Sequence, residues 1–354
     1  MENKNCYKCS KKAQFNYKSG LIVCAICYND QICMRKFRSF LRNSLDVFGK
    51  TNKLLCVYDG SINSVMLTHM FVLNTDNVEN DKKRMFLQGE VIYVDFSNLF
   101  TIMESLKACD INKDLHNLAI NNPSNKRKEV FIKFMEDIKA SYKILSVEDY
   151  YDLNKLAEKM NNIAVVGGYR QDYLSIVKKN VIKTYMTTND YDKVIISDNA
   201  QQLATRSLKL MCKSRTNEIS QECSEKYIEI YKDKELLIGR PLAEINDREI
   251  LYYTKINNLF GYVFDDMEDL NNYNLKKYSN LPGNGNMNTL LADFVRNLQG
   301  EFVSTASTIL KTIKKVDDDA YKANGYRCSV CLHHCLEYAD IDKKICKGCK
   351  IFNL

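Results

Sequence analysis

Short apolar segments alternate with stretches of helical periodicity through the middle of the chain. The apolar segments are rich in Val, Ile, Leu and Tyr, as buried strands are, and between most of them apolar residues recur at helical spacing. This alternation predicts an α/β fold with a mainly parallel sheet and helices on both faces. The predicted strands are Leu54 to Tyr58, Val91 to Phe96, Lys143 to Val147, Ile163 to Val166, Val194 to Ser197 and Leu236 to Ile238.

Two segments interrupt the alternation. Residues 112–128 and 265–286 are polar and rich in Asn, and they contain two of the three prolines. Such composition is typical of mobile loops, so we expect two insertions in one α/β domain rather than two domain boundaries.

Composition limits the class of protein. With 354 residues and 45% hydrophobic content, the chain is long enough to bury a proper core. Its longest mostly apolar run, Ser64 to Leu73, has ten residues, whereas a membrane span needs about 20. We therefore expect no membrane association. The formal charge of +7 permits a nucleic-acid partner but does not by itself indicate one. Because 14 cysteines occur without a secretory signal, we expect reduced or metal-bound thiols and a cytosolic or nuclear protein.

Eight of the cysteines form two sets with one spacing. In each set two CxxC pairs are separated by 14 residues, and the sets are Cys6, Cys9, Cys24 and Cys27, and Cys328, Cys331, Cys346 and Cys349. Four thiolates form a closed tetrahedral site of the kind that structural Zn²⁺ prefers, so we predict one zinc ion in each set. Buried or redox-active cysteines are the alternative. Cys33, Cys335, His333 and His334 lie near enough in sequence to replace a ligand, and pairing between the two ends of the chain stays open.

A turn of small residues follows the first predicted strand. Asp59 to Asn63 read DGSIN, and the apolar residues that follow recur at helical spacing. This order places backbone N–H groups at a helix N-terminus, where phosphate groups are commonly bound. A plain strand-to-helix loop is the alternative.

The order of these features resembles the cytoplasmic tRNA 2-thiolation protein 2 family along nearly the whole chain. The features are the paired CxxC motifs, KFRSFLR, the phosphate-loop-like turn, DNAQQLATRSL, GRPL, LADFVRNLQGEFVSTASTILKT and the closing CxxC pairs. The resemblance implies a fold like that of the PP-loop ATPases that thiolate tRNA. It divides the chain into an N-terminal zinc nodule with a basic helix (1–45), a degenerate PP-loop-like domain (46–320) and a C-terminal zinc nodule (321–354).

The motifs depart from those of catalytic PP-loop relatives, which carry SGGxDS in the phosphate loop. Here the loop residues are Asp59, Gly60, Ser61, Ile62, Asn63 and Ser64, so an acid enters at the first position and an acid is lost at the fifth. An NADDxAE-like stretch is replaced by Asn199 to Thr205, with Gln201 and Gln202 in place of the acids, and Ile163 to Val166 replace a CxxC pair. The resemblance therefore implies no catalytic residue and no bound ATP in this chain. The remaining thiols, Cys56, Cys109, Cys212 and Cys223, lack partners at ligand spacing.

A basic helix is the predicted RNA contact. Arg35, Arg38 and Arg42 recur at three and four residues and so share one helical face. Guanidinium groups suit phosphate oxygens, although a solvated basic face is the plain alternative. The secondary candidates are Lys126, Arg127 and Lys128, and Arg206, Lys209, Lys213 and Arg215.

Together these observations predict a noncatalytic, cytoplasmic subunit that binds tRNA during 2-thiolation of wobble uridine. By resemblance, its partner is a catalytic sister, cytoplasmic tRNA 2-thiolation protein 1, which adenylates the uridine and receives sulfur from a thiocarboxylated ubiquitin-related modifier. Two alternatives remain: an active PP-loop thiolase with divergent motifs, and a zinc-bearing scaffold without RNA contact. ATP binding distinguishes the first alternative, and tRNA binding the second.

Overall fold

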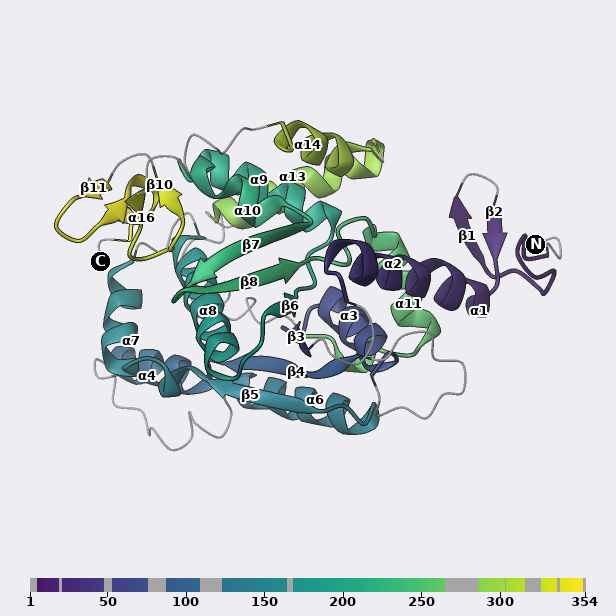
Figure 1. The fold of residues 1–354 in the computed structure, drawn as a ribbon, viewed down its shortest axis with the longest axis horizontal. Helices are drawn as coiled ribbons and strands as arrows, with labels where there is room; N and C mark the ends of the chain where they lie inside the picture. Colours follow the sequence, from purple (N-terminus) through teal and green to yellow (C-terminus); the bar gives the residue numbers. More distant parts are fainter. Residues whose placement is uncertain are drawn as a thin grey trace.

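The computed structural model describes residues 5–18, 21–47, 53–75, 87–108, 123–163, 168–264, 286–302, 304–315, 326–335 and 338–352. Within these ranges the central sheet has six strands in the order β5-β4-β3-β6-β8-β7 (Figure 1). All neighbouring pairs are parallel except β7 with β8. The strands are β3 (Lys53–Tyr58), β4 (Gln88–Asp95), β5 (Tyr142–Ser146), β6 (Lys193–Ile195), β7 (Lys226–Tyr231) and β8 (Lys234–Gly239).

The central strands are apolar throughout because both faces of the sheet are covered. In β3, Leu54, Cys56 and Tyr58 belong to one hydrophobic core, whereas Leu55 and Val57 belong to the other. The first core is closed by α2 (Met34–Ser44), α3 (Ile62–Val72), α6 (Pro123–Asp137) and α11 (Asp247–Ile256), and the second by α4 (Ser97–Ala108), α7 (Leu153–Asn162) and α8 (Tyr169–Thr188). This is the two-sided α/β arrangement that the hydrophobic pattern predicts.

A further group of helices packs beside the sheet. It consists of α9 (Ala200–Cys212), α10 (Ile219–Cys223), α13 (Met287–Glu301) and α14 (Thr305–Ile313). Small residues allow close contact in this group, since Ala204 of α9 is buried against Val295 and Ala306. The described residues also form the short 3-10 turns η3 (Val147–Asp149), η5 (Thr216–Glu218) and η6 (Phe260–Tyr262).

The two cysteine-rich ends lie at opposite ends of the molecule (Figure 1). The N-terminal one contains β1 (Phe15–Lys18), β2 (Leu21–Val23), α1 (Ala25–Tyr28) and the π-helical turn η1 (Asn29–Cys33), which leads into α2. The C-terminal one contains β9 (Tyr326–Arg327), β10 (His334–Cys335), β11 (Tyr338–Asp340), β12 (Ile345–Cys346) and α16 (Lys347–Lys350). Both contribute cysteines to the central hydrophobic cores.

Five of the six predicted strands are present, and the sixth, Ile163 to Val166, lies outside the described residues beyond Ile163. The sequence pattern missed β7, an antiparallel edge strand. Its Ile228 and Ile230 are 60% and 56% exposed, so this strand lacks the continuous apolar character of the buried ones.

Most of both predicted insertions also lies outside the described residues, while residues 123–128 begin α6. No helix in the described ranges is long and apolar enough to cross a membrane.

Candidate functional site: a degenerate phosphate loop and two four-cysteine clusters

The phosphate-loop-like turn connects β3 to α3, and its donors are bonded within the turn. Gly60 has a φ of +80°, and Ser61 is the N-cap of α3, with its Oγ accepting from the backbone N–H of Ser64 at 3.2 Å. The Asp59 carboxylate accepts from the Ser61 N–H at 3.1 Å and from the Ser61 hydroxyl at 2.6 Å. Asp59 thus places negative charge beside donors that a phosphate would otherwise use.

Phe264 lies directly against this turn. Its backbone N–H donates to the Gly60 carbonyl at 2.8 Å, and a Cβ added to Gly60 would lie 2.2 Å from its ring. The ring also meets Tyr58 and Tyr93 edge-on, with centroid distances of 5.8 and 6.3 Å. No local sequence motif marks Phe264, because the contact joins segments about two hundred residues apart.

Two amides meet where the resemblance implies that acids have been lost. The Asn63 Nδ2 donates to the Gln202 Oε1 at 2.7 Å, which joins α3 to the first turn of α9. Gln202 also completes a capping box with Asn199, accepting from the Asn199 backbone N–H at 3.2 Å. The Gln202 oxygen therefore has two donors and needs no cation to balance it.

The third degenerate motif falls mainly outside the described residues, which include Ile163 but not residues 164–167. After it, the buried Arg170 donates to the carbonyl of Ile163 at 3.0 Å and to that of Asn161 at 3.1 Å, so it anchors this connection. Burial raises the pKa values of the Cys56 and Cys223 thiols to about 12, which makes them poor nucleophiles. Cys212 is exposed, and Cys109 lies outside the described residues.

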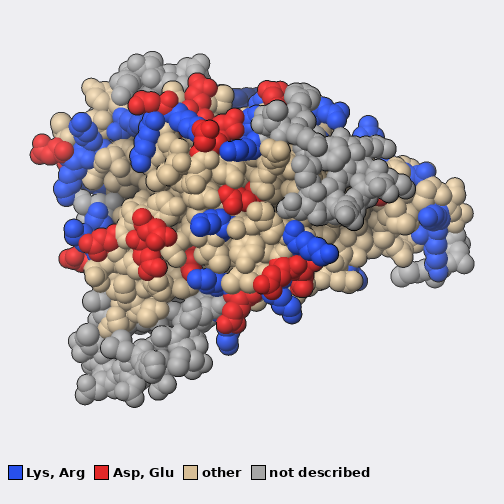
Figure 2. All heavy atoms as spheres, turned by 60° about the horizontal axis from the view of Figure 1, so that its bottom comes forward, with Lys and Arg blue, Asp and Glu red and all other residues tan. Residues whose placement is uncertain are grey.

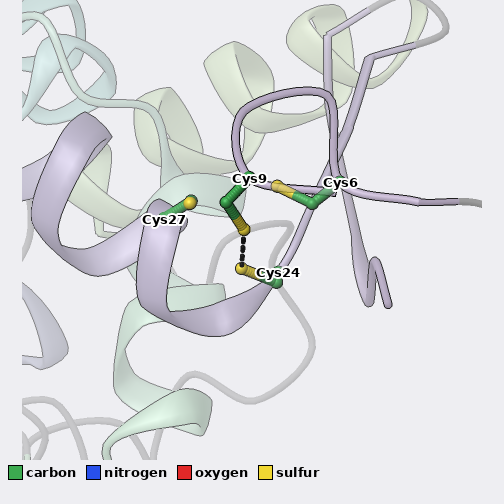
Figure 3. A group of neighbouring side chains, drawn as sticks. All are labelled: Cys6, Cys9, Cys24 and Cys27. Atoms are coloured by element: carbon green, nitrogen blue, oxygen red, sulfur yellow. Dashed lines mark hydrogen bonds between the residues drawn. The ribbon is translucent and has the colours of Figure 1, made fainter. Parts of the chain in front are cut away.

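The N-terminal cysteine set comes together as one cluster (Figure 3). The sulfurs of Cys6, Cys9, Cys24 and Cys27 lie within 4.8 Å of one another, and the Cys9 and Cys24 sulfurs are 3.5 Å apart. Burial opposes ionisation of Cys6, but backbone N–H groups of Cys24, Lys8 and Cys9 outweigh it and lower its pKa to about 6. The thiolate is therefore favoured at Cys6, whereas burial and the neighbouring cysteines raise the pKa of the Cys27 thiol.

The C-terminal set forms a matching, fully buried cluster. Its four sulfurs also lie within 4.8 Å, with Cys331 and Cys346 3.9 Å apart, and the Cys328 sulfur accepts from the N–H groups of Val330 and Cys346 at 3.4 Å. One tetrahedral ion with bonds of about 2.3 Å requires sulfurs about 3.8 Å apart. Both clusters fit a single ion better than an iron–sulfur cubane, whose thiolates bind four separate irons and lie farther apart.

The other proposed ligands with described side chains are not among the four cysteines of either cluster. Each cluster draws its cysteines from one end of the chain, and the described Cys33 and Cys335 belong to neither. His333 instead lies with Glu218 and Cys331, 3.7 Å from a Glu218 oxygen and 3.4 Å from a Glu222 oxygen. The side chain of His334 is outside the described part.

The predicted RNA-contact helix is α2, and two of its three arginines project into solvent. Arg35 and Arg42 are exposed, whereas Arg38 is half-buried and its Nε donates to Asn74 Oδ1 at 2.7 Å. Phe37, Phe40 and Leu41 of the same helix are buried, as the periodicity predicts. On the face shown in Figure 2, basic and acidic side chains are interspersed, so the net charge does not form one basic patch there.

The secondary basic cluster is used internally. Arg206 forms a bidentate ion pair with the Asp198 carboxylate at 2.5 and 2.6 Å, and Arg215 forms an ion pair with Glu218 at 2.7 Å. Lys213 donates to Asp172 at 2.5 Å. Of the other candidates, Lys128 pairs with Asp95 at 3.2 Å, and Arg127 is buried. These contacts favour structural roles over RNA contact.

Comparison with known proteins agrees with this geometry. A family model described as cytoplasmic tRNA 2-thiolation protein 2 matches residues 286–349. A protein of that name from Drosophila mojavensis is 25% identical over 317 residues, covering 88% of this chain and 71% of the relative. One from Caenorhabditis elegans is 22% identical over 358 residues, covering 99% and 93%. The predicted family resemblance is confirmed.

A solved structure shows that the fold of this chain also resembles that of a tRNA thiolase. The U34-tRNA thiolase NcsA from Methanococcus maripaludis, determined with its [4Fe-4S] cluster, superimposes with a TM-score of 0.61 at 15% identity. The match covers 100% of this chain and 97% of that one. The PP-loop-like α/β fold is thereby confirmed. The names of the relatives include the word cytoplasmic, which agrees with the predicted localisation.

Proposed function

We propose that this chain is the noncatalytic, tRNA-binding subunit of a cytosolic complex that 2-thiolates wobble uridine. The observation that carries the proposal is the 2.7 Å bond between Asn63 and Gln202, within a fold whose relatives are tRNA 2-thiolation proteins. Two neutral amides that satisfy each other cannot replace the negative charge that holds Mg²⁺ on a nucleotide.

The surroundings of the loop support the same conclusion. Asp59 is an acid beside the phosphate position, and Phe264 packs on Gly60. Of the described cysteines outside the two clusters, Cys56 and Cys223 have pKa values raised to about 12, where little thiolate exists at neutral pH. The chain is therefore expected to bind no ATP and to transfer no sulfur alone.

Zinc is the proposed metal of both cysteine clusters. Cys6, Cys9, Cys24 and Cys27 would hold one ion, and Cys328, Cys331, Cys346 and Cys349 the other. Four thiolates leave no open position, so each ion would stabilise its nodule rather than activate water. The ends of the chain, residues 1–45 and 321–354, would then be metal-dependent nodules on a degenerate PP-loop-like domain, residues 46–320.

The tRNA surface is proposed to include Arg35, Arg38 and Arg42 of α2. Arg35 and Arg42 are exposed on the helix that follows the N-terminal nodule through the η1 turn, so both guanidinium groups can reach phosphate oxygens. Arg38 would contribute charge while it holds Asn74.

The complex is completed by a catalytic sister. Because this chain keeps the fold but has lost the acids of the nucleotide site, adenylation and sulfur transfer fall to a related subunit, cytoplasmic tRNA 2-thiolation protein 1. Sulfur would arrive from a thiocarboxylated ubiquitin-related modifier. This chain would hold the tRNA in register with the sister's active site.

Three measurements on this chain test the proposal. Isolation from cells should copurify the sister, calorimetry should detect no specific ATP binding, and anisotropy should detect salt-dependent tRNA binding. Micromolar ATP affinity would favour the alternative of a divergent active thiolase. Absence of tRNA binding, with the sister still present, would favour a zinc-bearing scaffold without RNA contact.

A further inference from the structure

A groove of about 490 Å³ lies between the N-terminal cysteine nodule, α2 and the segments flanking the edge hairpin of β7 and β8. Its volume is within the range of about 300–1,000 Å³ that small-ligand sites occupy. The side chains that distinguish it are Tyr7, Lys8, Arg35, Asn43, Glu225 and Glu244.

One part of the groove combines positive charge with an aromatic ring. Tyr7 is 47% exposed, and the Lys8 ammonium lies 5.7 Å from its ring centroid. Within the described part of the chain, neither Lys8 nor Arg35 forms an ion pair, so both charges are available to a ligand. The Lys8 backbone N–H donates to Cys6 Sγ at 3.4 Å, and Tyr7 and Lys8 are therefore positioned by the cysteine cluster.

Another part of the groove carries two carboxylates. Glu225 precedes β7 and Glu244 follows β8, and the antiparallel pairing of these strands brings the two residues to the same end of the hairpin. Burial, together with the Glu244 charge, raises the pKa of Glu225, while Lys314 and Lys226 partly oppose that shift. Among the described residues neither carboxylate has a hydrogen-bonded or ion-paired partner, so both can accept from adjacent N–H donors of a ligand.

We propose that this groove holds one unpaired nucleotide of the bound tRNA and prefers guanine. The inference rests on the proposed tRNA-binding function and adds a base-specific contact to it. Lys8 and Arg35 would bind the phosphate, the Tyr7 ring would stack on the base, and Glu225 and Glu244 would accept from the base edge. Guanine fits because it alone presents two adjacent donors, N1–H and N2–H, on its Watson–Crick edge.

Short single-stranded RNAs test this directly. The four probes are fluorescein-labelled oligouridines whose central residue is U, G, A or C, and each is titrated with the whole, metal-loaded chain at fixed salt. The G probe should bind about tenfold more tightly than the others. The double substitution Glu225→Gln with Glu244→Gln should abolish this preference, and Tyr7→Ala should lower the affinity for all four probes about tenfold.

Matched variants keep the result interpretable. Tyr326→Ala removes a tyrosine that is 45% exposed beside the other cysteine cluster, and Glu235→Gln removes an exposed acid of β8; neither should change any affinity. Tyr7→Ala must retain the metal content of the unsubstituted chain.

Equal binding of all four probes would overturn the groove proposal, as would a guanine preference that survives both glutamate substitutions. A different result would contradict the proposed function, namely that the unsubstituted chain binds no tRNA. Salt-dependent tRNA binding without guanine preference would leave the proposed function standing and remove the groove alone.

Discussion

The backbone N–H of Phe264 donates to the carbonyl of Gly60, so a ring from beyond α11 lies on the phosphate-loop-like turn. Phe264→Ala should lower the free energy of unfolding by about 2 kcal/mol, since the half-buried ring packs on Tyr58 and Tyr93. Urea unfolding measures the change. Phe260→Ala, at a ring that is 50% exposed, is the control and should cost less than about 0.5 kcal/mol.

The same variant also tests whether Phe264 alone excludes nucleotide. Because Asp59 still occupies the Ser61 donors, Phe264→Ala should gain no specific ATP binding in calorimetry. A variant that bound ATP at micromolar concentration would show that the ring, and not the loop chemistry, is what closes this site.

The amide pair predicts a measurable coupling. Asn63→Ala and Gln202→Ala should each destabilise the chain, and the double variant should cost less than their sum by about 1 kcal/mol, because both single changes remove one 2.7 Å bond. A double-mutant cycle by urea denaturation gives the coupling energy. Strict additivity would mean that the bond contributes nothing to stability.

The cysteine clusters predict two zinc ions per chain. Elemental analysis of the purified protein should find about two zinc atoms and no stoichiometric iron. Cys6→Ser and Cys349→Ser should each remove about one ion and destabilise their own nodule. Less than one zinc per chain, or four irons in either cluster, would contradict the single-ion geometry inferred from the 3.5 and 3.9 Å sulfur separations.

Asp198 should make the stability of the fold sensitive to acid. Burial raises its pKa, but the Arg206 and Arg240 guanidinium groups outweigh this and lower it to about 2 from the model-peptide value of 3.8. A depressed pKa gives stability that is full above about pH 4 and is lost as the pH falls toward 2. The size of this contribution is about 2 kcal/mol.

Asp198→Asn should therefore flatten that part of the stability profile and cost about 3 kcal/mol at pH 7, because the buried Arg240 and the half-buried Arg206 lose their counter-charge. Denaturation at a series of pH values measures both effects. Asp190→Asn, at a carboxylate that is 89% exposed, is the matched control. An unchanged profile for Asp198→Asn would show that the ion cluster does not stabilise the fold.

Local sequence patterns were sufficient to predict the buried strands and the two cysteine clusters. The strands β3, β4, β6 and β8 contain short apolar runs because helices cover both faces, β5 contributes a shorter one, and the repeated CxxC spacing predicted both clusters. By contrast, β7 is an exposed edge strand. Its Ile228 and Ile230 alternate with polar residues and face solvent, so the search for continuous apolar runs did not find it.

The site contacts that the sequence did not reveal are long-range. Phe264 reaches Gly60, Asn63 reaches Gln202, and Tyr7 shares a groove with Glu244, in each case across more than a hundred residues. The row of cations from Arg206 to Arg215 resembles a nucleic-acid patch in sequence, but the fold turns Arg206, Lys213 and Arg215 toward acids. Their partners could be identified only after the helices were placed.

If this chain positions tRNA and makes no use of its phosphate-loop-like turn, the 2-thiouridine content of tRNA should depend on α2 and not on Ser64. Cells would carry, as their only copy, either Arg35→Glu with Arg42→Glu or the loop variant Ser64→Ala. Arg38 is left unchanged in this pair because of its bond to Asn74, and the triple reversal that includes it should weaken tRNA binding further.

We expect wobble-uridine thiolation to fall severalfold with the arginine variant, while the sister subunit still copurifies, and to stay nearly normal with Ser64→Ala. The opposite result, normal thiolation without the two arginines and loss of thiolation with Ser64→Ala, would show that the loop is active and that α2 is only a solvated surface.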